Sequence, residues 1–172
     1  MGKAKERSFQ MALYWKYRSQ FTFAAPNYTP RKWWECDMWA LLRSGYTIEY
    51  EIKMSMSDLH ADKNKQQSFY EPHYCTMRKH DMLSEGHQYA PNRFMFVVPE
   101  SIAEKAKNAI PDWAELLVHH DRFRITKAKP APLIHKNKEH QQTLEHCMTC
   151  LTNRYWPMLA QLNKQEQPND SD

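Results

Sequence analysis

An acidic residue and an acid-x-lysine triplet lie close together in the first third of this chain. Asp37 stands in an apolar run, and the triplet Glu51-Ile52-Lys53 follows it after a short turn. Carboxylate oxygens are the ligands that a hard divalent cation such as Mg2+ prefers. A lysine beside such a cation can stabilise the negative charge that develops when a phosphodiester is attacked. These residue types at this spacing are the minimum set for metal-dependent phosphodiester cleavage.

The pattern of residues 46–54 predicts the strand that would present the triplet. Polar and apolar side chains alternate there with period two, so Glu49, Glu51 and Lys53 share one face. The preceding run, residues 33–42, is rich in aromatic and aliphatic side chains and also predicts a strand. Together the two strands would carry acids on one side of a hairpin.

The loop between these strands decides which side chains face each other. Residues 43–45 suit a three-residue loop that ends in glycine, and this loop pairs Asp37 with Glu51. Cross-strand neighbours have Cβ atoms roughly 5 Å apart, and two facing carboxylates repel each other unless a cation or proton lies between them. A two-residue loop would pair Asp37 with Ile52 instead, and that alternative stays open.

Glu35 shares this face and, in the same register, lies opposite Lys53. It could bind a second ion or pair with the lysine, so the number of metal ions is open. A Glu-x-Lys triplet by itself is more often an exposed ion pair worth less than about 1 kcal/mol. The upstream acid on the paired strand is what favours a site over that simpler explanation.

The same residues resemble the signature of the PD-(D/E)XK nuclease superfamily, in which an acid is followed after a hairpin by Glu-x-Lys. Further blocks, in the same order, are similar to a phage and bacterial branch of it: residues 50–62, 79–80, 91–100 and 129–137. The likeness covers roughly residues 30–156. The nominal proline of the pattern is Cys36 here.

The resemblance implies a metal-dependent nuclease that hydrolyses DNA, in a bacterium or a phage-infected cell. Asp37, Glu51 and the backbone carbonyl of Ile52 would hold Mg2+ or Mn2+, and Lys53 would orient or activate the attacking water. Residues of the same branch that are expected near the site are Asp58, Asp62, Lys79 and His80. The implied fold is a restriction-endonuclease-like core.

A basic stretch offers a surface for the substrate. It runs from position 122 to position 138, holds no acid, and contains Arg122, Arg124, Lys127, Lys129, Lys136 and Lys138. Such a stretch can follow phosphates and fix the position of DNA without reading its bases. An ordinary solvated surface explains it equally well. The alternative function is a non-catalytic nucleic-acid-binding protein on the same fold.

The remaining pattern predicts an α/β fold, a mixed central sheet flanked by helices. Helices are expected over residues 8–21, from 57 or 58 to 65, and over 77–85, 101–110 and 136–163; strands over 93–99, 114–119 and 122–126; a loop over 25–30. We expect one domain over residues 1–163 and a polar tail over 164–172.

Composition agrees with a small enzyme and excludes some classes. The 172 residues carry a net charge of +4, and the three glycines leave no Gly-rich phosphate loop. No apolar run approaches membrane-spanning length and no secretory signal is visible, so a cytoplasmic location without membrane contact is expected. Cys147 and Cys150 form a CxxC beside His146, but the segment reads as a helix with these thiols on one face, so structural zinc is the less favoured alternative.

Overall fold

The computed structural model describes residues 2–70, 74–121, 123–138 and 141–166. Two compact units divide the chain, Met1–Lys138 and Glu139–Asp172. The boundary between these units lies within residues 1–163, the range expected to form one domain. The expectation of one domain stays a prediction. No described helix is long and apolar enough to cross a membrane.

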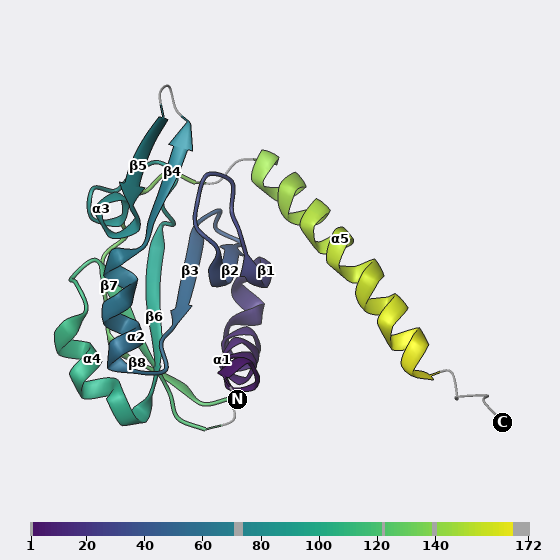
Figure 1. Cartoon of the computed structure of the whole chain (residues 1–172), viewed down its shortest axis with the longest axis horizontal. Helices are drawn as coiled ribbons and strands as arrows, with labels where there is room; N and C mark the ends of the chain where they lie inside the picture. Colours follow the sequence, from purple (N-terminus) through teal and green to yellow (C-terminus); the bar gives the residue numbers. More distant parts are fainter. Residues whose placement is uncertain (1, 71–73, 122, 139–140, 167–172) are drawn as a thin grey trace. The chain divides into compact units, whose positions relative to one another are not determined.

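A six-stranded mixed sheet forms the centre of the first unit (Figure 1). Its order is β1 (Phe21–Tyr28), β2 (Cys36–Leu42), β3 (Thr47–Ile52), β6 (Arg93–Pro99), β7 (Ala114–His119) and β8 (Ile125–Lys129). β3, β6 and β7 run parallel, whereas β1, β2 and β8 join as antiparallel neighbours. The predicted fold class, a mixed central sheet flanked by helices, is confirmed.

Helices cover both faces of this sheet. α1 (Gly2–Tyr17) buries Phe9, Ala12 and Leu13 against alternate residues of β3, including Ile48 and Tyr50. α2 (Met56–Ala61) and α4 (Ala103–Ala109) contact each other on the opposite side (Figure 1). Because side chains of a strand alternate between faces, Glu49 and Glu51 must point away from α1. The central strand is therefore buried on both faces, with apolar residues on one and acids on the other.

The predicted register between β2 and β3 is confirmed. Met38 pairs with Tyr50, and the Leu42 N–H donates to the Tyr46 carbonyl at 2.8 Å across a three-residue loop. Gly45 ends this loop with φ +86°, a left-handed conformation that glycine adopts without strain. Continued beyond the ladder, this register brings position 37 level with position 51. β2 begins only at Cys36, however, so the predicted strand start at position 33 is wrong.

Several predicted boundaries differ from the structure. The expected loop over residues 25–30 is largely part of β1, which buries alternate side chains and tolerates Pro26 because it is an edge strand. The helix expected over 8–21 ends at Tyr17, where the short helix η1 (Arg18–Gln20) leads into β1. The expected strand at 122–126 is β8, displaced toward the C-terminus.

The segment between α2 and β6 contains a hairpin that the sequence pattern did not predict. η2 (Asp62–Asn64) continues α2 and leads into β4 (Gln66–Tyr70), which pairs with β5 (Tyr74–Arg78). α3 (Lys79–Ser84) follows directly, so the helix expected from position 77 begins two residues later. η3 (Glu100–Ile102) precedes α4, and Ser101 does not cap it.

The second unit is described from position 141 as one long helix, α5 (Gln141–Glu166), which contains Pro157. The helix expected over 136–163 therefore begins later, because residues 136–138 are not helical. Within α5, the Cys150 Sγ lies 3.7 Å from His146 Nε2. The predicted tail over 164–172 falls partly on α5 and partly outside the described residues.

Candidate functional site

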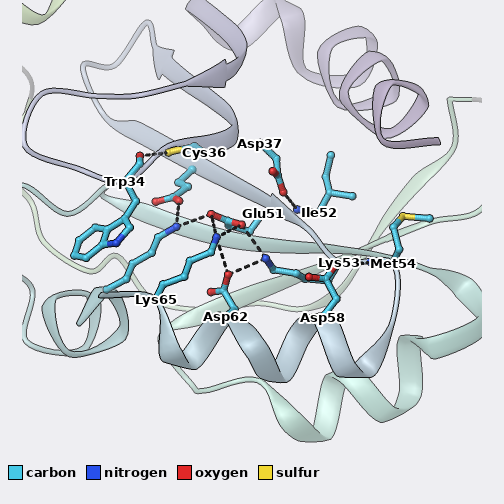
Figure 2. A network of polar contacts seen from close by, with 12 residues as sticks. Trp34, Cys36, Asp37, Glu51, Ile52, Lys53, Met54, Asp58, Asp62 and Lys65 are labelled. Carbon is cyan, nitrogen blue, oxygen red and sulfur yellow. Dashed lines mark hydrogen bonds and ion pairs between the residues drawn. The ribbon is translucent and has the colours of Figure 1, made fainter. Parts of the chain in front are cut away.

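A cluster of acids and lysines lies under the face of β3 that points away from α1 (Figure 2). Glu49 and Glu51 come from β3, and both side chains are almost fully buried. Lys79, the first residue of α3, is buried completely, and Asp62 enters from η2. Burying four ionisable groups is costly unless each is paired. The contacts among them show that they are.

Glu51 is the centre of the cluster, and its two carboxylate oxygens accept from three ammonium groups. Oε1 accepts from Lys79 at 2.5 Å and from Lys65 at 2.9 Å. Oε2 accepts from Lys65 at 2.8 Å and from Lys53 at 3.0 Å. Lys65 follows η2 and is the most accessible of the three, with its side chain 33% exposed. A single carboxylate is therefore enclosed by positive charge.

Asp62 ties the same lysines to α3. Its Oδ1 lies 2.7 Å from Lys53 Nζ and 2.9 Å from Lys65 Nζ, and its Oδ2 lies 2.8 Å from His80 Nε2. The His80 ring packs edge-on against Trp113 at 5.1 Å. Asp62 and Glu51 together therefore fix the position of the Lys53 ammonium.

Glu49 is held by a different set of partners. It forms an ion pair with Lys79, and its Oε2 accepts from the Trp33 indole N–H at 2.7 Å. Lys79 therefore bridges the two glutamates of β3. The Cys36 thiol lies close enough to Glu49 that the glutamate, together with burial, raises the pKa of that thiol.

The Asp37 carboxylate contacts the C-terminal end of β3 rather than the lysines. Its Oδ2 accepts from the Ile52 backbone N–H at 2.6 Å, where the β2–β3 ladder has ended (Figure 2). In a strand the N–H and carbonyl of one residue point to the same neighbour, so the Ile52 carbonyl is directed to the same side. One carboxylate and one backbone carbonyl thus lie near each other beside Glu51.

Two acids of the site hold protons more tightly than usual. Burial, reinforced by the charge of Glu51, raises the pKa of Asp37 to about 6, although the Ile52 N–H opposes the shift. Burial raises the pKa of Glu49 to about 7 against the opposing charge of Lys79. Both groups change protonation close to neutral pH, as acids that serve in catalysis often do.

The other charged groups are locked in their ionised forms. Burial opposes the charge of Glu51, but Lys79, Lys65 and Lys53 outweigh it and lower the pKa of Glu51 to about 2. The pKa of Asp62 is likewise far below its usual range, held there by His80 and the lysines against burial. Glu51 and Asp62 raise the pKa of Lys53 above its ordinary value despite burial. Lys53 is therefore an ammonium group at neutral pH.

Most of the predicted site residues come together. The structure groups Glu51, Lys53, Asp62, Lys79 and His80 in one network of contacts, and Asp37 lies beside it, bonded to the Ile52 N–H. Glu35 does not join it: it precedes β2 and is exposed, and Lys53 forms its ion pairs with Glu51 and Asp62. Asp58 is also exposed, and its carboxylate accepts from the Met54 N–H at 3.2 Å at the start of α2. Within the part of the chain that the structure describes, neither residue has a contact with the acids and lysines around Glu51 that would support the expected role, and that role stays a prediction.

Three residues of the network were not predicted as members. Glu49 was expected on the correct face, and its spacing of two from Glu51 was the available signal. Trp33 contacts Glu49 although it precedes β2. Lys65 carries no sequence signal, because it reaches Glu51 only through the length of α2 and η2.

Some residues of the predicted basic stretch form ion pairs with acids, and several are exposed. Lys127 pairs with Glu115, and Lys129 lies 3.0 Å from Asp112. Lys127 is nevertheless exposed, as are Arg124, Lys136 and Lys138. Arg122 lies outside the described residues. A continuous phosphate-binding stripe is thus reduced to separate positions, and its role in binding stays a prediction.

Among the described residues, no group of three or more His, Cys, Asp or Glu side chains is arranged to hold a metal ion. This holds for the CxxC of α5 and for the acids around Glu51 alike. Any cation at the cluster would have to use backbone oxygen and water as well. Mg2+ commonly does so, taking only one or two carboxylates.

Comparison with known proteins adds only the fold. No protein-family model matches the chain, and no curated protein matches it. A solved structure, the SPO1766 protein of unknown function from Silicibacter pomeroyi, is similar, with a TM-score of 0.53 and 15% identity. The similarity covers 86% of this chain and 84% of that chain. At this identity the likeness concerns the arrangement of helices and strands.

Proposed function

We propose that this protein is a Mg2+- or Mn2+-dependent nuclease that hydrolyses DNA phosphodiesters. The observation that carries the proposal is the register of β2 and β3, which, continued past Met38 and Tyr50, brings Asp37 level with Glu51. Lys53 follows directly after β3. A half-buried and a buried acid at level positions are unfavourable for folding alone. Their arrangement is explained if a cation and a phosphate are bound there.

The donor set fits a hard divalent cation. Asp37 and Glu51 would supply carboxylate oxygens, and the Ile52 carbonyl is directed to the same side. Lys65 already places a positive charge on both oxygens of Glu51, and its partly exposed side chain can leave. When bound, the metal would polarise the phosphoryl group and lower the pKa of a bound water.

The chain's own residues would hold and neutralise the substrate. Lys53 stays protonated because Glu51 and Asp62 raise its pKa, so it donates hydrogen bonds to developing negative charge and does not remove a proton. Asp62 positions Lys53 through the 2.7 Å ion pair. Lys65, once released from Glu51, supplies a second cation for a phosphate oxygen.

Nicking of supercoiled plasmid tests this proposal. We expect nicking with Mg2+ or Mn2+, none with EDTA, and loss of activity in Asp37→Asn and Lys53→Ala. Glu35→Gln is the matched control, because Glu35 is an exposed acid two residues from Asp37 and outside the network. Nicking that survives both site variants, or its absence in the wild type on DNA and RNA substrates alike, would overturn the proposal.

A second candidate is a nucleic-acid-binding protein with no cleavage activity. It is favoured by one observation, that lysines already satisfy both oxygens of Glu51. In that case the cluster is a closed ion network with no need for a metal. A calorimetric titration with Mn2+ distinguishes the two candidate functions. Binding of Mn2+ that is lost in Asp37→Asn supports the nuclease proposal.

A further inference from the structure

The outer face of α1 carries an exposed aromatic stripe that the core does not need. Met11, Tyr14 and Trp15 are 48%, 42% and 44% exposed, and Arg18 follows one turn later. Their spacing of three and four residues puts them on one side of the helix. The opposite side already packs against the sheet. These side chains are therefore free to contact something outside the first unit.

A groove lies beside the C-terminal end of this stripe, where α1 meets the turn before β8. Its volume is about 510 Å3, and it is lined by Trp15, Lys16, Phe123, Arg124 and Ile125. Ile125 is buried, whereas the Phe123 ring is 57% exposed. The Lys16 ammonium donates to the Ile125 carbonyl at 2.6 Å, which ties the helix to the strand. The two exposed rings thus stand on two connected elements.

Positive charge surrounds these rings. The Arg18 guanidinium lies 4.5 Å from the centre of the Trp15 ring. Arg124 is 3.5 Å from Asp121, and both side chains are more than half exposed, so this pair is weak and can yield to another anion. Lys16 adds a third cation. A ligand for this groove should therefore combine a flat ring with negative charge.

We propose that the groove binds single-stranded nucleic acid, with one unpaired base stacked on Trp15 and Phe123. Arg18 and Arg124 would contact the phosphates on either side of that base. Exposed aromatic rings flanked by arginines are what sequence-tolerant binding of single strands uses. A protein partner would meet the same rings, but a protein interface is depleted of charge at its centre. The charges around this groove favour the nucleic acid.

The groove is separate from the acid–lysine cluster. Trp15 belongs to the helix on the Ile48 and Tyr50 face, whereas Glu51 points to the other face. β8 is an edge strand, and β6 and β7 stand between it and β3. The groove can bind a single-stranded nucleic acid whether or not the cluster around Glu51 cleaves it. The inference thus goes beyond the proposed cleavage and does not rest on it.

The inference is tested by measuring the binding of a labelled oligothymidylate to the full chain. Fluorescence anisotropy in the presence of EDTA reports the binding. Stacking is worth about 1–3 kcal/mol per base, so Trp15→Ala and Phe123→Ala should each weaken binding by roughly 5-fold or more. Trp15→Phe should retain most of the affinity. Trp156→Ala is the matched control, an exposed tryptophan on α5 that should leave the affinity unchanged.

A salt series checks the phosphate contacts. Arg124→Gln should lower the slope of log affinity against log salt by about 0.7, the value for one phosphate of a single strand. The inference is overturned if wild type does not bind single strands, or if Trp15→Ala and Phe123→Ala bind normally. It is also overturned if these variants change only the oligomeric mass in sedimentation, which would identify a protein interface. Unchanged thermal melting of both variants shows that they fold.

Discussion

The Lys65 ammonium lies 2.9 and 2.8 Å from the two carboxylate oxygens of Glu51. It thereby occupies both oxygens that a metal ion would need. Lys53 and Lys79 also contact Glu51, and all three lysines contact a further acid, but the side chains of Lys53 and Lys79 are buried. Lys65 is the partly exposed member, so it is the group that a divalent cation would displace.

Replacement of Lys65 should therefore strengthen metal binding. A hydrogen bond to a charged group is worth about 1.5–3 kcal/mol, so Lys65→Met should tighten Mn2+ binding by about 10-fold in calorimetric titration. Lys63→Met is the matched control, because Lys63 is an exposed lysine of the same η2 turn. Equal affinity in wild type and Lys65→Met would show that Lys65 and the metal do not compete.

Lys79 should matter most for folding. It is completely buried between Glu49 and Glu51, and its removal leaves the buried Glu49 carboxylate without its ion-pair partner, whereas Glu51 keeps Lys53 and Lys65. Loss of one partner from a buried ion pair costs about 3–5 kcal/mol. We expect Lys79→Met to lose that much free energy of unfolding in urea titration at pH 8.

A second substitution tests the reason for that loss. Glu49→Gln added to Lys79→Met removes the buried charge that has lost its partner and should recover part of the stability. The loss in Lys79→Met should also be smaller at pH 5, because the pKa of Glu49 is already raised to about 7 and its proton is retained there. Additive effects of the two substitutions at both pH values would contradict this account.

Asp37 should make the protein less stable as the pH rises. Burial and Glu51 raise its pKa to about 6 from an ordinary value of 3.8, so the folded state binds the proton more tightly than the unfolded state does. Stability from this group is then full below about pH 4 and is lost as the pH passes about 6. Asp37→Asn removes this dependence and can still accept from the Ile52 N–H.

The expected result is a pH-dependent difference between Asp37→Asn and the wild type. In metal-free buffer, the variant should gain about 1–3 kcal/mol of relative stability between pH 4 and pH 8. Urea titrations at both values measure it. A constant difference across this range would mean that Asp37 does not titrate there. A gain of stability at neutral pH would also agree with the general observation that residues of functional sites lower the stability of the fold.

The sequence predicted the part of the site that depends on strand geometry. The alternation over residues 46–54 placed the acids of β3 correctly, and the loop length gave the register that brings Asp37 level with Glu51. Both follow from local rules of side-chain direction and turn type. Residues fixed by those rules could therefore be named before the structure was known.

The site residues that the sequence did not predict are positioned by contacts between segments far apart in the chain. Lys65 reaches Glu51 only because η2 extends α2 by one short turn, and the β4–β5 hairpin then returns the chain to Lys79. No periodic pattern encodes such a path. The prediction for Glu35 failed because the strand was predicted three residues too long, and the Glu35 side chain is exposed in the segment before Cys36.

The contacts of Asp62 predict a role in positioning Lys53 if the cluster is a nuclease site. Asp62 lies 2.7 Å from Lys53 and also holds His80, but it lies away from the Asp37 carboxylate that would bind the metal. Asp62→Asn keeps the shape of the side chain and removes its charge. Loss of such a supporting partner typically lowers activity by about 10–100-fold. We expect this loss in kcat for plasmid nicking, with little change in KM.

Asp58→Asn is the matched control for this prediction. Asp58 lies one turn earlier on the same helical segment, is exposed, and hydrogen-bonds with Met54 and Ser55 at the start of α2. It should leave kcat within about 2-fold, and any effect should concern stability, by at most about 1 kcal/mol for a weakened cap. Equal losses of kcat in the two variants would mean that the negative charge of the segment matters and that Asp62 does not position Lys53.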